Sequence, residues 1–171
     1  MKKTIARLGI AAFITLSASI GAPVTMHREG MVLSPYYDKI GNKVTWCVGE
    51  TEVGKKDKFT YEECSLLYHV RYGYYSMRVT ALYSDTARDV VTPPIHAAFT
   101  DMAYNVGFSA LQRSTMIREA NAGRLKQACD AILLYKYAGG RDCSLPENKR
   151  ICGGIWTRRL EFHQMCLGGI Q

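Results

Sequence analysis

The chain has 171 residues and a formal net charge of +7, and 47% of its residues are hydrophobic. This length supports one domain with a sizeable core plus a small additional segment. The positive charge favours a polyanionic partner such as anionic lipid or the carboxylate-rich bacterial cell wall. Nucleic acid is disfavoured, because the sequence has no recognised binding motif and no Lys/Arg run longer than two.

The N-terminal segment is typical of an export signal. Three basic residues precede an uncharged run from Leu8 to Met26, which is close to the ~20 residues that cross a bilayer core. Its apolar side chains contribute roughly −2 to −4 kcal/mol to insertion, and its Gly, Ser, Thr and Pro residues reduce that sum. We expect residues 1–26 to insert but to be held weakly, ahead of a domain at 27–171.

Two outcomes are open for this segment. It could be cleaved near the small residues Ser17-Ala18-Ser19, or it could stay attached and later leave the bilayer. Its Gly, Ala and Ser content favours release. The segment has no Cys, which excludes activation by disulfide exchange with the anchor. No second long apolar run follows, so the rest of the chain is expected to be soluble.

Residues 27–59 are rich in Gly, Thr, Val and turn residues and predict a small β-lobe. Within this lobe, Glu29 lies just before an apolar and aromatic run, Asp38 ends that run, and Thr45 opens a strand-like stretch. Two carboxylates that reach one cleft from different backbone settings are what glycosidic bond hydrolysis needs. One must stay protonated as the general acid, and the other must stay ionised.

Each of these residues also has a structural explanation. Glu29 could cap the start of a helix, and Asp38 could be a turn residue. As catalytic groups, Glu29 would be the general acid, because the apolar run after it would favour its protonated form. Asp38 and the Thr45 hydroxyl would hold the attacking water. A wide carboxylate separation, with room for that water, predicts inversion at the anomeric carbon.

The rest of the chain predicts a series of helices. A capping-box signature at Thr60–Glu63 precedes apolar residues at helical spacing, which are Leu67, Val70, Tyr74 and Met77. Further helices are predicted from Pro94 to Gly107, from Ser114 to Gly123, over 125–133 and over about 155–167. A small sheet followed by helices indicates an α+β architecture with two lobes around a cleft.

Six cysteines without a C-x-x-C pair predict disulfides and not a zinc site. Two bracket a short loop, two join a strand to the next helix, and two remain on late helices. The expected pairs are Cys143–Cys152, Cys47–Cys64 and Cys129–Cys166. The alternative is six buried reduced thiols in a cytosolic protein. The four histidines lack ligand spacing, so we expect no metal and no cofactor.

Three segments carry recognisable motifs in order. They are HREGMVLSPYYDKIGNKVTWCVGETEVG (27–54), a central region with YNVG, STMIREANAG and YAGG (97–140), and GIWTRRLEFHQMCL (154–167). Together they resemble the phage-type lysozymes, which are endolysins with a Glu/Asp/Thr catalytic set. The resemblance implies a lysozyme-like fold, a monomeric muramidase, and catalytic roles for Glu29, Asp38 and Thr45. It also implies an N-terminal segment that anchors the protein and is then released.

Some positions depart from the family's pattern. One additional residue separates Asp38 from Thr45, which lengthens the turn between them. Glu50 stands where relatives often carry His, residues 134–136 replace a segment that usually contains Trp, and Glu161 is one residue short of its usual spacing.

Four further residues are candidates for a role at the site, two for sugar binding and two for tuning the carboxylates. The family lines its cleft near Tyr104 and Asn105, and an Asn side chain can donate to and accept from an N-acetyl group. The alternative is an ordinary Asn at a helix end. Arg158 or Arg159 could reach a catalytic carboxylate and tune its ionisation, or could lie on a solvated helix face.

The expected function is hydrolysis of the β-1,4 bond between N-acetylmuramic acid and N-acetylglucosamine in peptidoglycan. The enzyme would be tethered to the host inner membrane and face the periplasm. Because only two residues separate Met26 from Glu29, the tethered form would be inactive, and the enzyme would act after release into the periplasm. The alternative enzyme is a lytic transglycosylase, which needs the acid but no water-holding pair. A second class is a non-catalytic cationic protein that binds the wall or permeabilises membranes.

Overall fold

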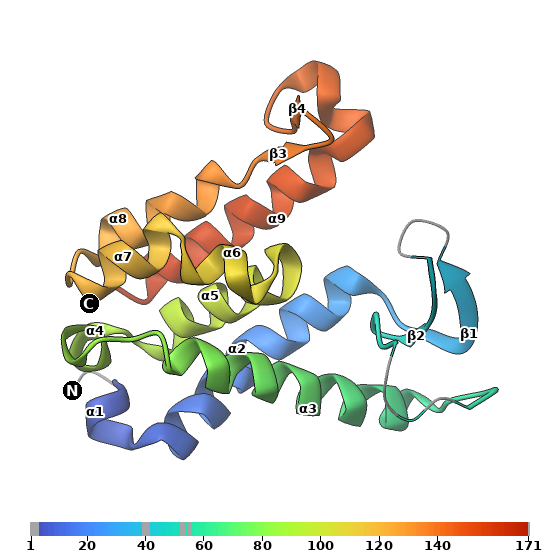
Figure 1. The fold of residues 1–171 in the computed structure, drawn as a ribbon, viewed down its shortest axis with the longest axis horizontal. Helices are drawn as coiled ribbons and strands as arrows, with labels where there is room; N and C mark the ends of the chain where they lie inside the picture. Colours follow the sequence, from blue (N-terminus) through green and yellow to red (C-terminus); the bar gives the residue numbers. More distant parts are fainter. Residues whose placement is uncertain (1–3, 39–41, 52–53, 55, 171) are drawn as a thin grey trace.

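The computed structural model describes residues 4–38, 42–51, 54 and 56–170, and at Glu29 it describes the backbone alone. In chain order the elements are α1 (Ile5–Leu8), α2 (Ile10–Glu29), β1 (Val32–Asp38), β2 (Lys43–Cys47), α3 (Tyr61–Thr80), α4 (Asp85–Val90), α5 (Pro93–Val106), α6 (Phe108–Gln112), α7 (Thr115–Asn121), α8 (Leu125–Asp130), η1 (Ala131–Leu134), β3 (Tyr137–Ala138), β4 (Arg141–Asp142), η2 (Pro146–Asn148) and α9 (Lys149–Gly168). They form an α+β fold in which the small β1–β2 lobe projects beside a larger helical lobe (Figure 1).

Helix α2 runs through the helical lobe between α3 and α5 (Figure 1). Its fully buried stripe recurs every four residues, as one face of a helix must, and consists of Phe13, Ser17, Gly21 and Thr25. All but Phe13 are small, so the neighbouring helices can approach α2 closely. The same helix, over Ile10–Arg28, is long and apolar enough to cross a membrane. It continues unbroken across residues 26 and 27, so the expected anchor and the start of the expected domain share one helix.

Helix α3 begins as the sequence predicted, but it buries a different face. Thr60 and Glu63 form the complete capping box. The buried positions include Tyr68 and Tyr72, whereas Val70, Tyr74 and Met77, whose spacing predicted the helix, are each more than half exposed. The hydroxyl groups of these two tyrosines do not prevent burial, because each aromatic ring supplies a large apolar area.

The main core lies between α5 and the elements around it. The Pro93-Pro94 pair supplies the first turn of α5, and the backbone leaves the helix at Gly107 with φ of 90°, as predicted for a helix-ending glycine. Phe99 and Met102 are fully buried in this core together with Phe162 of α9. Helix α9 starts at Lys149, earlier than expected, because two helical stretches meet at a kink at Cys152.

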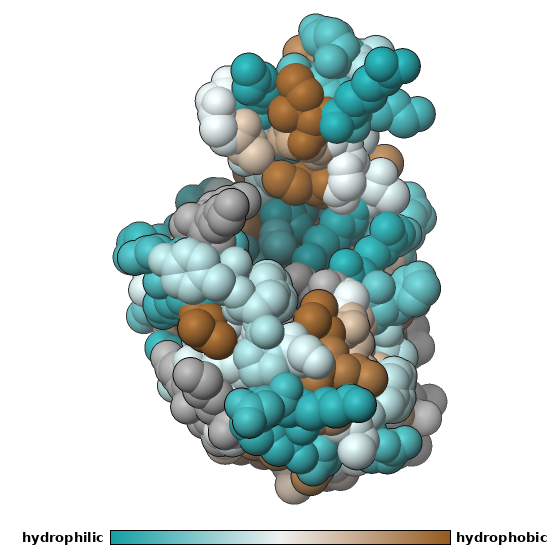
Figure 2. All heavy atoms as spheres, turned by 90° about the vertical axis from the view of Figure 1, so that its right-hand side faces the viewer, coloured by the Kyte–Doolittle hydropathy of each residue, from teal (hydrophilic) through white to brown (hydrophobic). Residues whose placement is uncertain are grey.

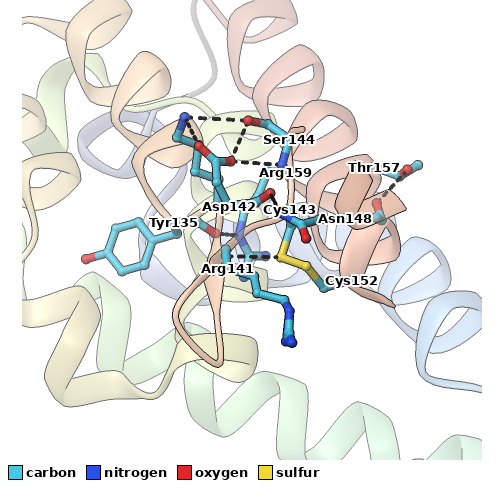
Figure 3. The surroundings of a disulfide bond; sticks show 11 residues. Tyr135, Arg141, Asp142, Cys143, Ser144, Asn148, Cys152, Thr157 and Arg159 are labelled. Carbon is cyan, nitrogen blue, oxygen red and sulfur yellow. Dashed lines mark hydrogen bonds and ion pairs between the residues drawn. A yellow bond between two sulfur atoms is a disulfide. The ribbon is translucent and has the colours of Figure 1, made fainter. Parts of the chain in front are cut away.

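Three disulfides join the same cysteines that the sequence analysis paired. Cys47–Cys64 connects β2 to α3, and Cys129–Cys166 connects α8 to α9. Cys143–Cys152 closes the loop after β4 onto α9 (Figure 3). The first bond fixes the β-lobe to the helical lobe, and the third fixes the β3–β4 hairpin to α9.

Candidate active site

Glu29 is the last residue of α2, and its side chain lies outside the described part of the chain. The backbone turns at Gly30, whose φ of 73° favours glycine, and continues into β1. The end of α2 is therefore joined directly to the β-lobe. A cap of a helix start, the structural alternative for Glu29, does not apply here, because Glu29 lies at the C-terminal end of its helix.

Asp38 and Thr45 lie on the two strands of the β1–β2 hairpin. Asp38 is paired with Lys43, and Thr45 is paired with Tyr36. Directly paired residues share a face of the hairpin, as do residues two apart on one strand. Asp38 and Thr45 are thus diagonal neighbours on the same face, about 7–8 Å apart. The longer turn between them does not separate them to opposite faces. Thr45 is buried and Asp38 half-buried.

A cleft of about 630 Å³ lies beside the end of α2. Its polar lining residues are Arg28, Asn105, Arg141 and Arg158, and the remaining lining comes from the β3–β4 hairpin and the first turns of α9. Figure 2 shows this hollow as a hydrophilic surface between two parts of the molecule. Since Arg28 immediately precedes Glu29, the cleft adjoins the expected catalytic segment. Three guanidinium groups line it, of which Arg28 and Arg158 are ion-paired with Glu161 and Asp101, so Arg141 supplies its positive charge.

Arg158 belongs to a buried charge network and not to a solvated helix face. Its Nη2 donates to Oδ1 of Asp101 at 2.6 Å, and its Nε donates to Oδ2 at 3.2 Å. Asp101 is fully buried and also accepts from the Thr25 hydroxyl at 2.9 Å. Burial raises the pKa of Asp101, while Arg158 and Thr25 hold it down. The network joins α2, α5 and α9 at the cleft wall.

Arg159 is buried as well and supports the cleft from a different side. Its Nε donates to the Tyr135 carbonyl at 3.0 Å, and its Nη2 donates to Oδ1 of Asn105. Burial lowers the pKa of Arg159. The exposed Asn105 side chain is therefore oriented by Arg159 while it lines the cleft. Asn105 thus lines this cleft, and its role in binding substrate stays a prediction.

Tyr104 links the two lobes. Its hydroxyl donates to the Val48 carbonyl at 2.7 Å, and its ring packs edge-on against Tyr68 and Tyr75. The cavity at the end of α2 is not lined by this side chain. These contacts give Tyr104 a packing role where the β-lobe meets α5, and its role in binding substrate stays a prediction.

Sequence reasoning missed several residues at this site. Arg28, which lines the cleft, forms an ion pair with Glu161 of α9. Thr25 and Asp101 were not singled out, although a lone Asp inside the apolar run of α5 is a signal of a buried charge that needs a partner. Glu50, where relatives often carry His, is buried and accepts two bonds from Arg71 at 3.1 and 3.2 Å.

The histidines lie apart, and among the described residues no group of three potential metal ligands comes together. His96 is fully buried between the hydroxyls of Ser76 and Tyr83, at 2.8 and 2.9 Å. Burial lowers the pKa of His96 to about 3, so it is a neutral core residue.

Solved structures with this fold are phage lysozymes and related muramidases. A mutant of P22 lysozyme superposes with a TM-score of 0.70 at 24% identity, covering 87% of this chain and 96% of that one. The endolysin from Escherichia coli O157:H7 phage FAHEc1 gives 0.69 at 20% identity, covering 88% and 92%. The active form of the P1 phage endolysin Lyz gives 0.68 at 18% identity, covering 94% of both chains. These likenesses define a lysozyme-like fold.

Residues 26–160 match the phage lysozyme family, and the chain belongs to that family. The SAR-endolysin of Enterobacteria phage PA-2 is 27% identical over 147 residues, which cover 84% of this chain and 79% of the relative. The SAR-endolysin of Escherichia phage 933W is 29% identical over 182 aligned positions, which cover 95% of this chain and 94% of the relative.

Proposed function

We propose that the protein is an endolysin that hydrolyses the β-1,4 bond between N-acetylmuramic acid and N-acetylglucosamine in peptidoglycan. The observation that carries this proposal is the arginine-lined cleft at the end of α2, with the β1–β2 hairpin directly after that helix. Peptidoglycan carries carboxylates on its muramyl units, which the Arg141 guanidinium in the cleft attracts. Membership of the phage lysozyme family supports the same reaction.

In this proposal Glu29 protonates the leaving glycosidic oxygen. Glu29 ends α2, where the helix meets the β-lobe beside the cleft. Asp38 and the Thr45 hydroxyl hold the attacking water from one face of the β1–β2 hairpin. Water attack on the face opposite the leaving oxygen inverts the anomeric carbon. The protein acts as a monomer, without a metal, a cofactor or nucleic acid.

We also propose that α2 has two locations. The protein is first anchored in the host inner membrane through residues 1–26, with the catalytic domain at 27–171 on the periplasmic side, and it is then released into the periplasm. The span Ile10–Arg28 supports an anchor. The same helix packs between α3 and α5, and one helix cannot occupy both places. The tethered form therefore lacks a core helix and is inactive.

The test uses the full-length protein and its Glu29→Gln variant on outer-membrane-permeabilised cells. We expect lysis by the wild type and loss of lysis by the variant, since Gln cannot donate the proton. Equal lysis by both would support a wall-binding or membrane-permeabilising protein instead. Mass analysis of the released sugars separates the two enzymes. Reducing ends support the hydrolase, and anhydro-sugar ends would identify a transglycosylase.

A further inference from the structure

Thr25 makes an unusual contact for a residue in a helix that can cross a membrane. Its side chain is fully buried, and its Oγ1 lies 2.9 Å from Oδ1 of Asp101 and 3.2 Å from the Gly21 carbonyl. A hydroxyl has one proton to donate. The bond to the Asp101 carboxylate is shorter and charge-assisted, so it is the stronger of the two.

Asp101 transmits this contact to the cleft. The same oxygen that accepts from Thr25 also accepts from Nη2 of Arg158 at 2.6 Å. Arg158 lines the cleft. Because burial raises the pKa of Asp101, its ionised form depends on Arg158 and on the Thr25 hydroxyl. Loss of either donor therefore weakens the negative charge on Asp101 that holds the remaining donor in place.

Thr25 also sets the position of the catalytic segment. It lies four residues before Glu29, one turn along α2 and on the same helix face. A hydrogen bond from Thr25 to α5 therefore fixes both the rotation and the axial register of the last turn of α2. Other buried residues of this stripe, such as Ser17, bond within their own helix.

We propose that Thr25 is a positioning residue that couples the docking of α2 to the completion of the cleft. When α2 docks, the Thr25 hydroxyl completes the hydrogen bonding of Asp101, Asp101 fixes Arg158 at the cleft wall, and the end of α2 takes its place beside it. When α2 is elsewhere, Asp101 lacks this donor. The inference rests on the proposed hydrolase function, but it assigns a role to a residue outside the expected catalytic set.

The test compares two identical substitutions on one helix, in full-length protein. Thr25→Val keeps the shape of the buried side chain and removes its hydroxyl. Thr15→Val is the matched control, because Thr15 is exposed and bonds only its own helix, at Ala11. Both changes add the same apolar group to the membrane-crossing segment. Thr25→Ser retains the hydroxyl and serves as the conservative rescue.

We expect Thr25→Val to lower kcat about 10- to 100-fold, the range for a misplaced active-site group. KM should change less, and the acid limb of the pH–rate profile should move to higher pH, because Asp101 loses a donor that favours its ionised form. Thr25→Ser and Thr15→Val should remain close to wild type. Equal kcat and pH profiles for Thr25→Val and Thr15→Val would overturn the inference, as would equal losses for Thr25→Val and Thr25→Ser.

A second variant decides the matter if Thr25→Val does not fold. Asp101→Asn keeps the side-chain shape and an acceptor oxygen for Thr25 but removes the charge that holds Arg158. We expect a similar loss of kcat, and because Asn does not titrate, the part of the acid limb that Asp101 sets should disappear. Wild-type kcat and pH dependence in Asp101→Asn would overturn the inference. Activity of wild type and Thr15→Val shows separately that the proposed function holds.

Discussion

Gly21 of α2 lies directly against Tyr72 of α3. A Cβ at Gly21 would overlap the Tyr72 hydroxyl and would lie 3.0 Å from the Cβ of Ala97 on α5. Only glycine allows this approach of the two neighbouring helices. The same residue weakens membrane insertion, since glycine adds little apolar surface. The composition that makes α2 a poor anchor is also what lets it pack as a core helix.

Gly21→Leu and Ser19→Leu should therefore separate anchoring from docking. Both should favour insertion by about 1 kcal/mol and delay release. Ser19 is exposed on docked α2, so released Ser19→Leu should keep wild-type activity. Gly21→Leu should lose activity even when released, because overpacking costs about 1–3 kcal/mol. Fractionation followed by a lysis assay of the soluble fraction checks both, and full activity of soluble Gly21→Leu would contradict the packing argument.

Arg141 should contribute to substrate affinity through charge. Its side chain points away from the Cys143–Cys152 bond (Figure 3) and lines the cleft, and the described residues offer its guanidinium no ion-pair partner. We expect Arg141→Ala to raise KM for peptide-bearing peptidoglycan about two- to fivefold, with little change in kcat and a weaker dependence of KM on salt. Arg150→Ala, an exposed charge change outside the cleft lining, is the control. Equal KM effects at both positions would indicate a general charge effect.

Removal of the Cys129–Cys166 bond should lower stability alone, whereas removal of the Cys143–Cys152 bond should lower stability and also raise KM. The first closes 37 residues, and double replacement by Ala should lower the free energy of unfolding by about 3–4 kcal/mol. The second closes only 9 residues, so the loss should be about 2–3 kcal/mol. Because Cys152 lines the cleft, the second change should also raise KM. Denaturant unfolding and steady-state kinetics of the two double variants test this contrast, which an unchanged KM would contradict.

His96 should make the protein less stable in acid. Burial lowers its pKa from 6.5 to about 3, so between these values the unfolded state binds a proton that the folded state excludes. Stability from this group is fully present above about pH 6.5 and should fall by about 1.4 kcal/mol per pH unit below it. Phe13 of α2 packs on the His96 ring, so α2 should also undock more readily as the pH falls.

The measurement is denaturant unfolding at several pH values between 4 and 7. His96→Gln should be less stable than wild type at pH 7, because its hydrogen bonds to Ser76 and Tyr83 are altered, but its stability should vary less with pH. His69→Gln, at an exposed position, is the control and should follow the wild-type curve. Parallel pH dependence of His96→Gln and wild type would contradict the assignment.

The amino-acid sequence by itself determined those features that depend on residues close together along the chain. The capping box at Thr60 and the helix end at Gly107 need only local backbone geometry, so their residue types identified them. The cysteine pairs followed from position along the chain, and the N-terminal segment followed from its charge and apolar content. Family motifs in order indicated the lysozyme-like fold.

The tertiary structure decided which surfaces meet, because burial depends on the partner and not on the residue alone. Tyr72 is buried and Val70 exposed on the same helix, since Tyr72 faces α2 and α5. The contact between Thr25 and Asp101 joins residues 76 positions apart, which no local pattern relates. The sequence identifies α2 as a segment that can enter a membrane, and its packing between α3 and α5 makes it part of the folded domain.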